Sequence, residues 1–179
     1  MNLQPEFLGD GVITLRPFRL EDAAAVAAAC RDPDIPRFTH VPENYGESDA
    51  RAFIAGSMNP EREERSFAIV DERDQLLGAI GFRTPHPGTG EIGYWLGAES
   101  RGRGAATRAV RLICEWAFEE LGLVRMQLLT HPENAPSQKL AERCGFRREG
   151  VLRAWVDMKE GRVDLVMYSL LPGELPAES

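Results

Sequence analysis

The most regular hydrophobic pattern in the chain lies between residues 105 and 121. Apolar residues recur there every three or four positions and charged residues fall on the opposite side. The apolar set is Ala106, Ala109, Val110, Ile113, Cys114, Ala117 and Leu121, and the charged set is Arg108, Arg111, Glu115 and Glu119. This period predicts an amphipathic helix with one buried face. Gly122 is expected to end it, because glycine readily adopts the left-handed conformation that closes helices.

Shorter segments rich in β-branched and aromatic residues predict strands on both sides of this helix. They cover residues 12–18, 66–71, 76–83 and 91–97 before it, and 125–130, 146–155 and 163–170 after it. Short connections such as Glu72–Gln75 join most neighbours, which indicates a mainly antiparallel sheet. Only the strand–helix–strand unit over residues 91–130 implies a parallel pair.

Three further helices are predicted from composition and capping residues. An alanine-rich helix ends at Cys30, a second is capped by Ser48 and runs to about Met58, and a short third covers residues 135–143. With no internal repeat or linker, these elements predict a single α+β domain over residues 1–179, with a mixed, mainly antiparallel sheet flanked by helices.

Proline and glycine mark the expected loops. The segments Asp34–Tyr45 and Thr84–Gly90 both contain proline and are predicted to be irregular. Residues 59–65, which are mostly charged, are expected to form an exposed connector, and the tail over residues 172–179 is expected to fray.

Composition narrows the function classes. A chain of 179 residues that is 43% hydrophobic and 27% charged suits one domain with a sizeable core. Its net charge of -7 argues against non-specific nucleic-acid binding and favours cationic or amine partners. The first eleven residues show no basic and apolar leader, and no run of about eighteen apolar residues occurs anywhere. We therefore expect a cytoplasmic protein that does not bind membranes.

Cysteine and histidine give no sign of a metal site. Cys30, Cys114 and Cys144 are odd in number and far apart, so we expect reduced cysteines in the core. The histidines at 40, 86 and 131 are not spaced like metal ligands and are expected to be structural or exposed. The tryptophans at 95, 116 and 155 are expected in the core.

The turn that precedes the long helix has the features of a phosphate site. Gly102 and Gly104 allow the backbone to approach a ligand closely, and the new helix presents unpaired N–H groups there. A Walker loop is excluded because no lysine follows Gly104, and a dinucleotide fingerprint is excluded because Thr107 stands where its third glycine belongs. An ordinary strand–turn–helix unit, in which the glycines only form the turn and bind no ligand, would show the same pattern.

The pattern Arg101-x-x-Gly104-x-Ala106 resembles the pyrophosphate loop of the GNAT superfamily of N-acetyltransferases. After the helix come a strand, then Asn134-x-x-Ser137, then a short helix ending in Cys144-Gly145-Phe146. That order over about sixty residues resembles the RimJ/RimL-type branch, which acetylates the N-termini of ribosomal proteins. The resemblance implies an acetyl-CoA-dependent N-acetyltransferase without a metal cofactor, and relatives in this branch are often dimers, so it also implies a homodimer.

The resemblance also implies a set of coenzyme contacts. The pyrophosphate would lie against the turn and first helical residues, which are Arg101, Gly102, Arg103, Gly104, Ala105, Ala106 and Thr107. The pantetheine arm would pair with the strand edge at Trp95, Leu96 and Gly97, splayed from the strand over residues 125–130. Asn134 would orient the pantetheine, and Ser137 would protonate the departing thiolate. Read from the residues alone, Asn134 and Ser137 are equally suited to capping the short helix.

The acceptor side is less defined. By resemblance, Glu91 is the candidate base, directly or through water, and Phe38, Tyr45, Glu91 and Trp95 are candidate acceptor contacts. Glu91 at a strand end and the aromatic residues of a loop equally fit purely structural roles. Many family members carry a tyrosine where this chain has Ala141. That departure motivates the hypothesis of an acyl-CoA-binding module without catalysis. For an active enzyme, the acceptor is left open between a protein N-terminus and a small-molecule amine, which the loops Asp34–Tyr45 and Thr84–Gly90 would decide.

Overall fold

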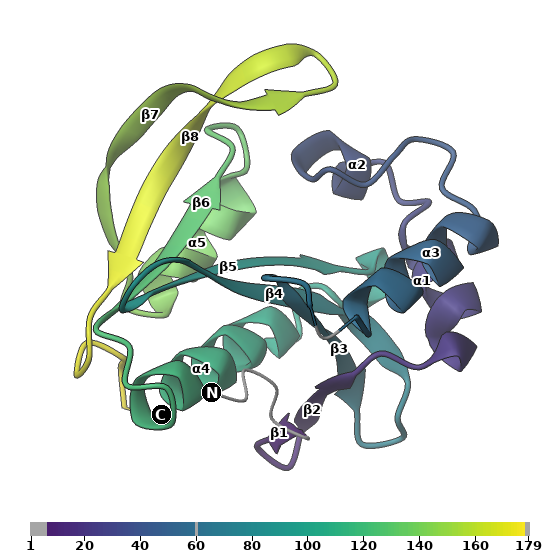
Figure 1. Ribbon diagram of the computed structural model, residues 1–179, viewed down its shortest axis with the longest axis horizontal. Coiled ribbons are helices and arrows are strands. Elements are labelled where there is room, and N and C mark those ends of the chain that lie inside the picture. The colour runs from purple at the N-terminus through teal and green to yellow at the C-terminus, as the bar shows by residue number, and fades with distance from the viewer. Residues whose placement is uncertain (1–6, 60, 178–179) are drawn as a thin grey trace.

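The computed structural model describes residues 7–59 and 61–177. The chain ends 1–6 and 178–179, and Pro60 in the predicted connector, lie outside the described residues. One eight-stranded sheet runs through the molecule in the order β1-β2-β3-β4-β5-β6-β8-β7 (Figure 1). Its strands are β1 Leu8–Gly9, β2 Ile13–Pro17, β3 Arg65–Asp71, β4 Leu76–His86, β5 Thr89–Leu96, β6 Arg125–Thr130, β7 Arg147–Met158 and β8 Gly161–Leu170. The helices are α1 Ala23–Ala29, α2 Asp34–Phe38, α3 Glu47–Ser57, α4 Ala105–Glu119 and α5 Ala135–Arg143, with 3-10 turns η1 Leu20–Asp22 and η2 Ala98–Ser100.

Strand pairing confirms the mixed, mainly antiparallel sheet. Every neighbouring pair in the sheet is antiparallel except β5 and β6, which the α4 crossover makes parallel. β5 pairs with β4 as far as Leu96, but it pairs with β6 only over Thr89–Ile92. Beyond Ile92 the two parallel strands therefore part, and one side of β5 has no neighbouring strand.

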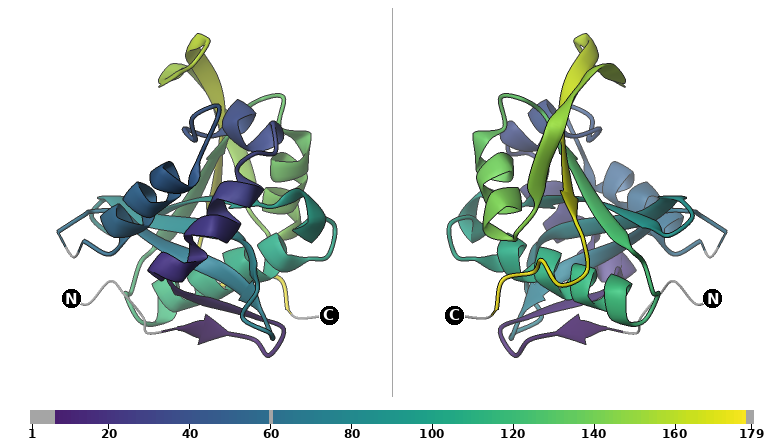
Figure 2. Two further views of the ribbon diagram at one scale, coloured as in Figure 1. Left: turned by 90° about the vertical axis from the view of Figure 1, so that its right-hand side faces the viewer. Right: turned by 90° about the vertical axis from the view of Figure 1, so that its left-hand side faces the viewer.

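Alternating side chains divide the core between the two faces of the sheet. Phe67, Ile69 and Ile80 point to the cluster that contains α4. Ala68, Val70 and Ala79 point to the cluster that contains α1 and α3. Figures 1 and 2 show these helices covering opposite faces of the sheet. The small residues on the second face allow α1 to pack closely.

The predicted long helix is confirmed as α4. Its apolar stripe is buried, and Ala109, Val110, Ile113, Cys114 and Ala117 are fully enclosed. The three cysteines are free and buried, as expected. Burial of this stripe fixes the position of the helix and therefore of the glycine turn at its start.

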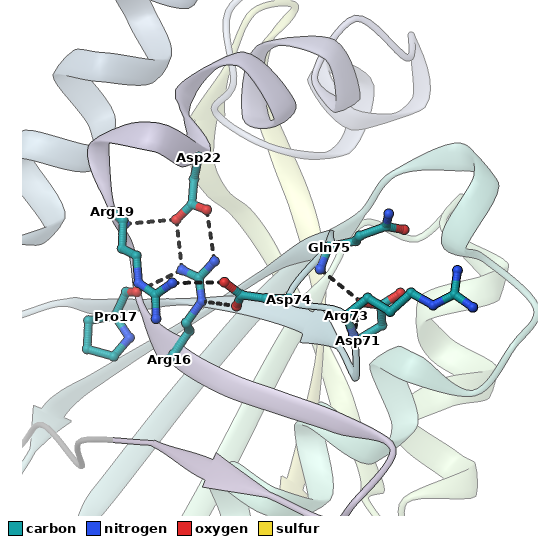
Figure 3. A network of polar contacts seen from close by, with 8 residues as sticks. All are labelled: Arg16, Pro17, Arg19, Asp22, Asp71, Arg73, Asp74 and Gln75. Atoms are coloured by element: carbon teal, nitrogen blue, oxygen red, sulfur yellow. Dashed lines mark hydrogen bonds and ion pairs between the residues drawn. The ribbon is translucent and has the colours of Figure 1, made fainter.

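A buried arginine holds the start of α1 against the sheet (Figure 3). The guanidinium of Arg16 donates two hydrogen bonds to Asp22, at 2.8 and 2.9 Å, and its Nε donates to Asp74 at 2.7 Å. Asp22 also accepts the backbone N–H of Arg19 at 2.8 Å. This network ties β2, η1 and the β3–β4 turn together.

Strands β7 and β8 form a long hairpin whose tip extends beyond the body of the molecule (Figure 2). Register shifts interrupt their pairing at Arg148/Gly150 and Leu152/Val156. At the tip, the Lys159 ammonium donates to the carbonyl oxygens of Pro36 at 2.9 Å and Val41 at 2.8 Å. We call this contact the Lys159 clasp, and it joins the hairpin tip to α2 and the loop that follows.

Two predicted loops prove to be partly regular. Asp34–Phe38 is the short helix α2, in which Asp32 Oδ1 accepts the Asp34 N–H and Pro36 falls in the first turn, where a missing N–H costs nothing. The segment 84–90 continues the strands, because Pro87 and Gly88 turn the chain in two residues and Gly88 has a φ of 74°.

Other boundaries also differ from prediction. Gly46, not Ser48, caps α3, because Asp49 at its third position accepts the Gly46 N–H at 2.8 Å. Trp155 was expected in the core and is 53% exposed on the hairpin. Up to Ala177 the tail is ordered against the domain, with Leu175 on the core and Glu174 paired to Arg147.

Candidate active site

The glycine turn before α4 presents an unobstructed row of backbone N–H groups. Gly102 and Gly104 have φ values of 74° and 80°, which favour glycine, and a Cβ at either position would meet no atom within 4 Å. Gly104 is the N-cap of α4 and no side chain caps it. Among the described residues, no hydrogen bond engages the N–H groups of residues 102–107. The turn and Ala105, Ala106 and Thr107 thus present positively polarised backbone N–H groups that suit a phosphate.

The two arginines of the turn have different surroundings. The Arg101 guanidinium pairs with Asp32 at 2.7 Å and Asp34 at 3.2 Å, and it donates to the Leu96 carbonyl oxygen. Arg101 therefore fastens the turn to β5 and the start of α2. Arg103 is exposed. Arg101 is also partly exposed, but its charge is shared with Asp32 and Asp34.

The parting of β5 and β6 leaves a strand edge open beside this turn. The Gly97 N–H already donates to Leu77 at 2.9 Å, and Arg101 occupies the Leu96 carbonyl oxygen. The unpaired edge of β5 is therefore centred on residues 93–95, including Trp95. An extended amide-containing chain can lie along such an edge as an additional strand.

A cavity of about 730 Å³ opens on the same part of the sheet. Its lining comes from α2, the following loop, α3, the strands β3 to β6, α5 with its cap, and the β7–β8 hairpin. Six predicted residues line it together, namely Phe38, Tyr45, Glu91, Trp95, Asn134 and Ser137. Leu96, Gly97 and residues 101–107 do not line it, so the structure separates the phosphate-type turn from the cavity.

Asn134 and Ser137 form the cap of α5. The Asn134 Oδ1 accepts the Ser137 backbone N–H at 3.2 Å, and Pro136 lies in the first turn. This capping contact uses the backbone of Ser137 and leaves its hydroxyl available. The hydroxyl of Ser137, whose residue is 8% exposed, lies within hydrogen-bonding reach of the Tyr94 hydroxyl. Burial raises the pKa of Tyr94, which keeps its phenol protonated at neutral pH.

Glu91 is held by its neighbours on both adjacent strands. Arg83 on β4 donates to its Oε1, through Nε at 2.8 Å and also through Nη2. Gln127 on β6 donates to Oε2 at 2.7 Å. The carboxylate thus lies in the cavity wall with both oxygens engaged. Arg83 is 51% exposed, so its contact is open to exchange with water.

The aromatic candidates differ in burial. Tyr45 is 8% exposed and belongs to the core beside α1 and α3, and burial raises the pKa of its phenol to about 12. Phe38 is half-buried, with its ring centroid 5.6 Å from that of His131. Trp95 packs partly on the same core and also lines the cavity. Phe38 and Trp95 therefore offer accessible aromatic surface, and Tyr45 mainly supports the wall.

Sequence reasoning did not identify several residues of this site. One of them, Tyr94, directly precedes the predicted residue Trp95 on β5. The other two, Arg83 on β4 and Gln127 on β6, lie directly across the sheet from Glu91. Strand register would have pointed to the latter two. No local signal marks Lys159, because its clasp joins segments more than 115 residues apart.

Within the described residues, no three His, Cys, Asp or Glu side chains are grouped as metal ligands. None of the helices in residues 7–59 and 61–177 has the length and apolar character needed to cross a membrane.

Comparison with known proteins places this chain in a family. The acetyltransferase (GNAT) domain profile matches residues 13–147. The uncharacterized N-acetyltransferase p20 of Bacillus licheniformis is 34% identical over 167 residues, covering 90% of this chain and 94% of p20. The ribosomal-protein-serine acetyltransferase of Escherichia coli is 28% identical over 126 residues, covering 69% of this chain and 70% of that enzyme.

A solved structure shows the same architecture with a coenzyme. The microcin C7 self-immunity acetyltransferase MccE, in complex with acetyl-CoA and AMP, superimposes with a TM-score of 0.81 at 26% identity. The match covers 90% of this chain and 93% of that one.

Proposed function

This chain belongs to the GNAT family of acetyl-CoA-dependent N-acetyltransferases and resembles its RimJ-like branch, and from that premise we propose that its acceptor is the α-amine of a protein N-terminus. The observation that supports the proposed activity most directly is the cavity of about 730 Å³ beside the parted strands, which is lined by Glu91, Trp95, Asn134 and Ser137. The similarity to a ribosomal-protein-serine acetyltransferase supports this choice of acceptor.

In this proposal the coenzyme lies across the sheet at the parting of β5 and β6. The N–H groups of residues 102–107 hold its pyrophosphate, and Arg103 adds positive charge at the rim. The pantetheine arm pairs with β5 at residues 93–95 and brings the thioester to the cavity. An N–H of that edge faces the thioester oxygen, where negative charge develops during attack.

The acceptor amine approaches from the side of Phe38 and Trp95. An α-amino group with a pKa near 7.8 is about 10 to 15% neutral at pH 7, whereas a lysine near 10.4 is only about 0.04% neutral. A weakly basic site is therefore sufficient for an N-terminus. Glu91, with both oxygens already hydrogen-bonded, fits that modest role through a water molecule better than it fits direct proton abstraction.

The departing thiolate needs a proton, and Ser137 is our candidate donor. Its backbone caps α5 while its hydroxyl remains in the cavity wall, so the two roles do not compete. Ser137→Ala is expected to lower kcat about 100-fold, within the usual range for general acid catalysis, without weakening acetyl-CoA binding. Ser57→Ala is the matched control, because Ser57 is also a buried helical serine but lies outside the cavity.

The assay is acetyl transfer to synthetic peptides, followed by mass spectrometry. Peptides with a free N-terminus should be acetylated there, and peptides with a blocked N-terminus and an internal lysine should not. Acetylation restricted to lysine would contradict the proposed acceptor. Wild-type turnover by Ser137→Ala would remove Ser137 from the mechanism.

The structural similarity to MccE favours a second candidate acceptor, a small-molecule amine. The same enzyme preparation should therefore be offered amino acids, polyamines and aminoglycosides. A kcat/KM for one of these that exceeds the value for every peptide would support this candidate over the first.

A further inference from the structure

A serine hydroxyl by itself is poorly matched to protonating a thiolate. An alcohol is a much weaker acid than a thiol, so a serine that gives up its proton needs another one as the transfer occurs. A phenol, with an ordinary pKa near 10, is much closer to a thiol in acidity. The proposed function therefore leaves an unfilled role for a group that touches Ser137.

Tyr94 lies in that position. Its hydroxyl is within reach of the Ser137 hydroxyl, and both residues line the cavity. The Tyr94 ring packs against the core cluster that contains Ala141 and Cys144. It reaches this cluster from β5, just beyond the point where β5 leaves β6.

Ser137 belongs to the buried face of α5. Ser137, Ala141 and Cys144 are spaced four and three residues apart on α5, so they share one face of the helix. Ser137 and Ala141 are both buried, and of the two it is Ser137 whose hydroxyl interacts with that of Tyr94.

We propose that Tyr94 and Ser137 act as a two-residue proton relay to the leaving thiolate. As the C–S bond of the tetrahedral intermediate breaks, the sulfur takes the Ser137 proton and Ser137 takes the Tyr94 proton. The resulting phenolate regains a proton from solvent, which has received the one lost by the acceptor nitrogen. Protons and charge balance over the cycle, and no further reactant is needed.

This relay rests on the proposed acetyl transfer, and Tyr94→Phe tests it because the ring is retained. The variant should bind acetyl-CoA like the wild type, as measured by calorimetry, while kcat falls about 10- to 100-fold. Tyr168→Phe is the matched control, since Tyr168 is another buried tyrosine near α5 but does not line the cavity. The double variant Tyr94→Phe/Ser137→Ala should be no slower than Ser137→Ala, because members of one relay are not additive.

Leaving-group acidity separates a relay from a structural role. With acetyl-seleno-CoA, whose selenol is far more acidic than a thiol, the departing group needs little protonation. The kcat defect of Tyr94→Phe should therefore shrink strongly with this substrate. An equal defect with both substrates, additive effects in the double variant, or wild-type turnover by Tyr94→Phe would each overturn the relay. Absence of transfer by the wild type to every amine would instead overturn the proposed function, and the relay with it.

Discussion

Two arginine–carboxylate groups in this molecule have similar partners but different environments. Arg16 is 7% exposed and divides its donors between Asp22, Asp74 and the Pro17 carbonyl oxygen (Figure 3). Arg83 is 51% exposed and directs its donors to a single oxygen of Glu91. The first group is closed on itself, whereas the second lies in a cavity wall.

The buried group therefore contributes to stability, whereas the exposed group leaves a carboxylate available for chemistry. Burial by itself raises the pKa of Asp22, but hydrogen bonds from Arg16 and from the Arg19 N–H outweigh it, and the net shift is downward. The Arg16 pKa is raised, chiefly by its hydrogen bonds to Asp22. Each of the two charged side chains therefore relies on the other for hydrogen bonds that water would supply in the unfolded chain. At Glu91 water can replace Arg83, so the carboxylate is available to a substrate or a bound water.

Removing the buried cation should give the largest effect. Arg16→Met leaves Asp22 buried without its partner and should lower the free energy of unfolding by about 3–5 kcal/mol. Denaturant titration measures this loss. Arg19→Met is the control, because Arg19 is 58% exposed and its pair with Asp74 should contribute less than about 1 kcal/mol. Equal losses of unfolding free energy in the two variants would contradict a larger contribution from the buried arginine than from the exposed one.

Blocking the glycine turn should weaken coenzyme binding beyond any effect of backbone strain at a positive φ. Gly104→Glu places a negative charge among the N–H groups of residues 102–107 and should weaken acetyl-CoA binding about 100-fold or more, equivalent to about 2.7 kcal/mol. Gly122→Glu is the matched control, because Gly122 follows the other end of α4, has a φ of 63° and faces open space. Calorimetric titration that shows the same affinity for both variants would argue against this coenzyme site.

Opening the Lys159 clasp should have a smaller effect on the acceptor side. Lys159→Ala removes the contacts to Pro36 and Val41, so the hairpin tip is no longer held to the loop after α2. We expect the KM for the acceptor to rise about 5-fold, roughly 1 kcal/mol as for a typical hydrogen bond, while acetyl-CoA affinity is retained. Lys139→Ala, on α5 outside the cavity, serves as the control. An unchanged acceptor KM would exclude a role for the clasp in binding.

The smallest effect should be found at an exposed pair and should depend on pH. Hydrogen bonds from Arg125 and Ser169 lower the pKa of Glu149 to about 2 from an ordinary 4.5. The stabilisation is therefore complete above about pH 4.5 and is lost as the pH falls towards 2. Glu149→Gln should flatten the decline of stability in that window and cost less than about 1 kcal/mol at pH 7. Thermal unfolding between pH 2 and 7 measures the loss of stability at low pH and the cost at pH 7. If Glu149→Gln loses stability towards pH 2 as steeply as the wild type, the lowered pKa of Glu149 is contradicted.

Local patterns were sufficient for most elements of the fold. The period of residues 105–121 predicted α4, and the strand–helix–strand order predicted the one parallel pair, because side-chain periodicity and connection length are local properties. The prediction was wrong at two prolines, because proline is found in irregular loops and also in first helical turns and tight hairpin turns. Pro36 and Pro87 suggested irregular loops, but one lies in a first helical turn and the other in a two-residue hairpin turn.

The sequence by itself determined the family resemblance and predicted the glycine turn, Asn134 and Ser137, because these lie in short motifs with fixed spacing; Glu91 was predicted from its place at the start of a strand. Only the tertiary structure decided that Arg101 is engaged by Asp32, that Arg83 and Gln127 hold Glu91, and that Tyr94 reaches Ser137. These contacts join segments from 8 to 69 residues apart. Their geometry depends on strand register and on the parting of β5 from β6, which no local pattern specifies.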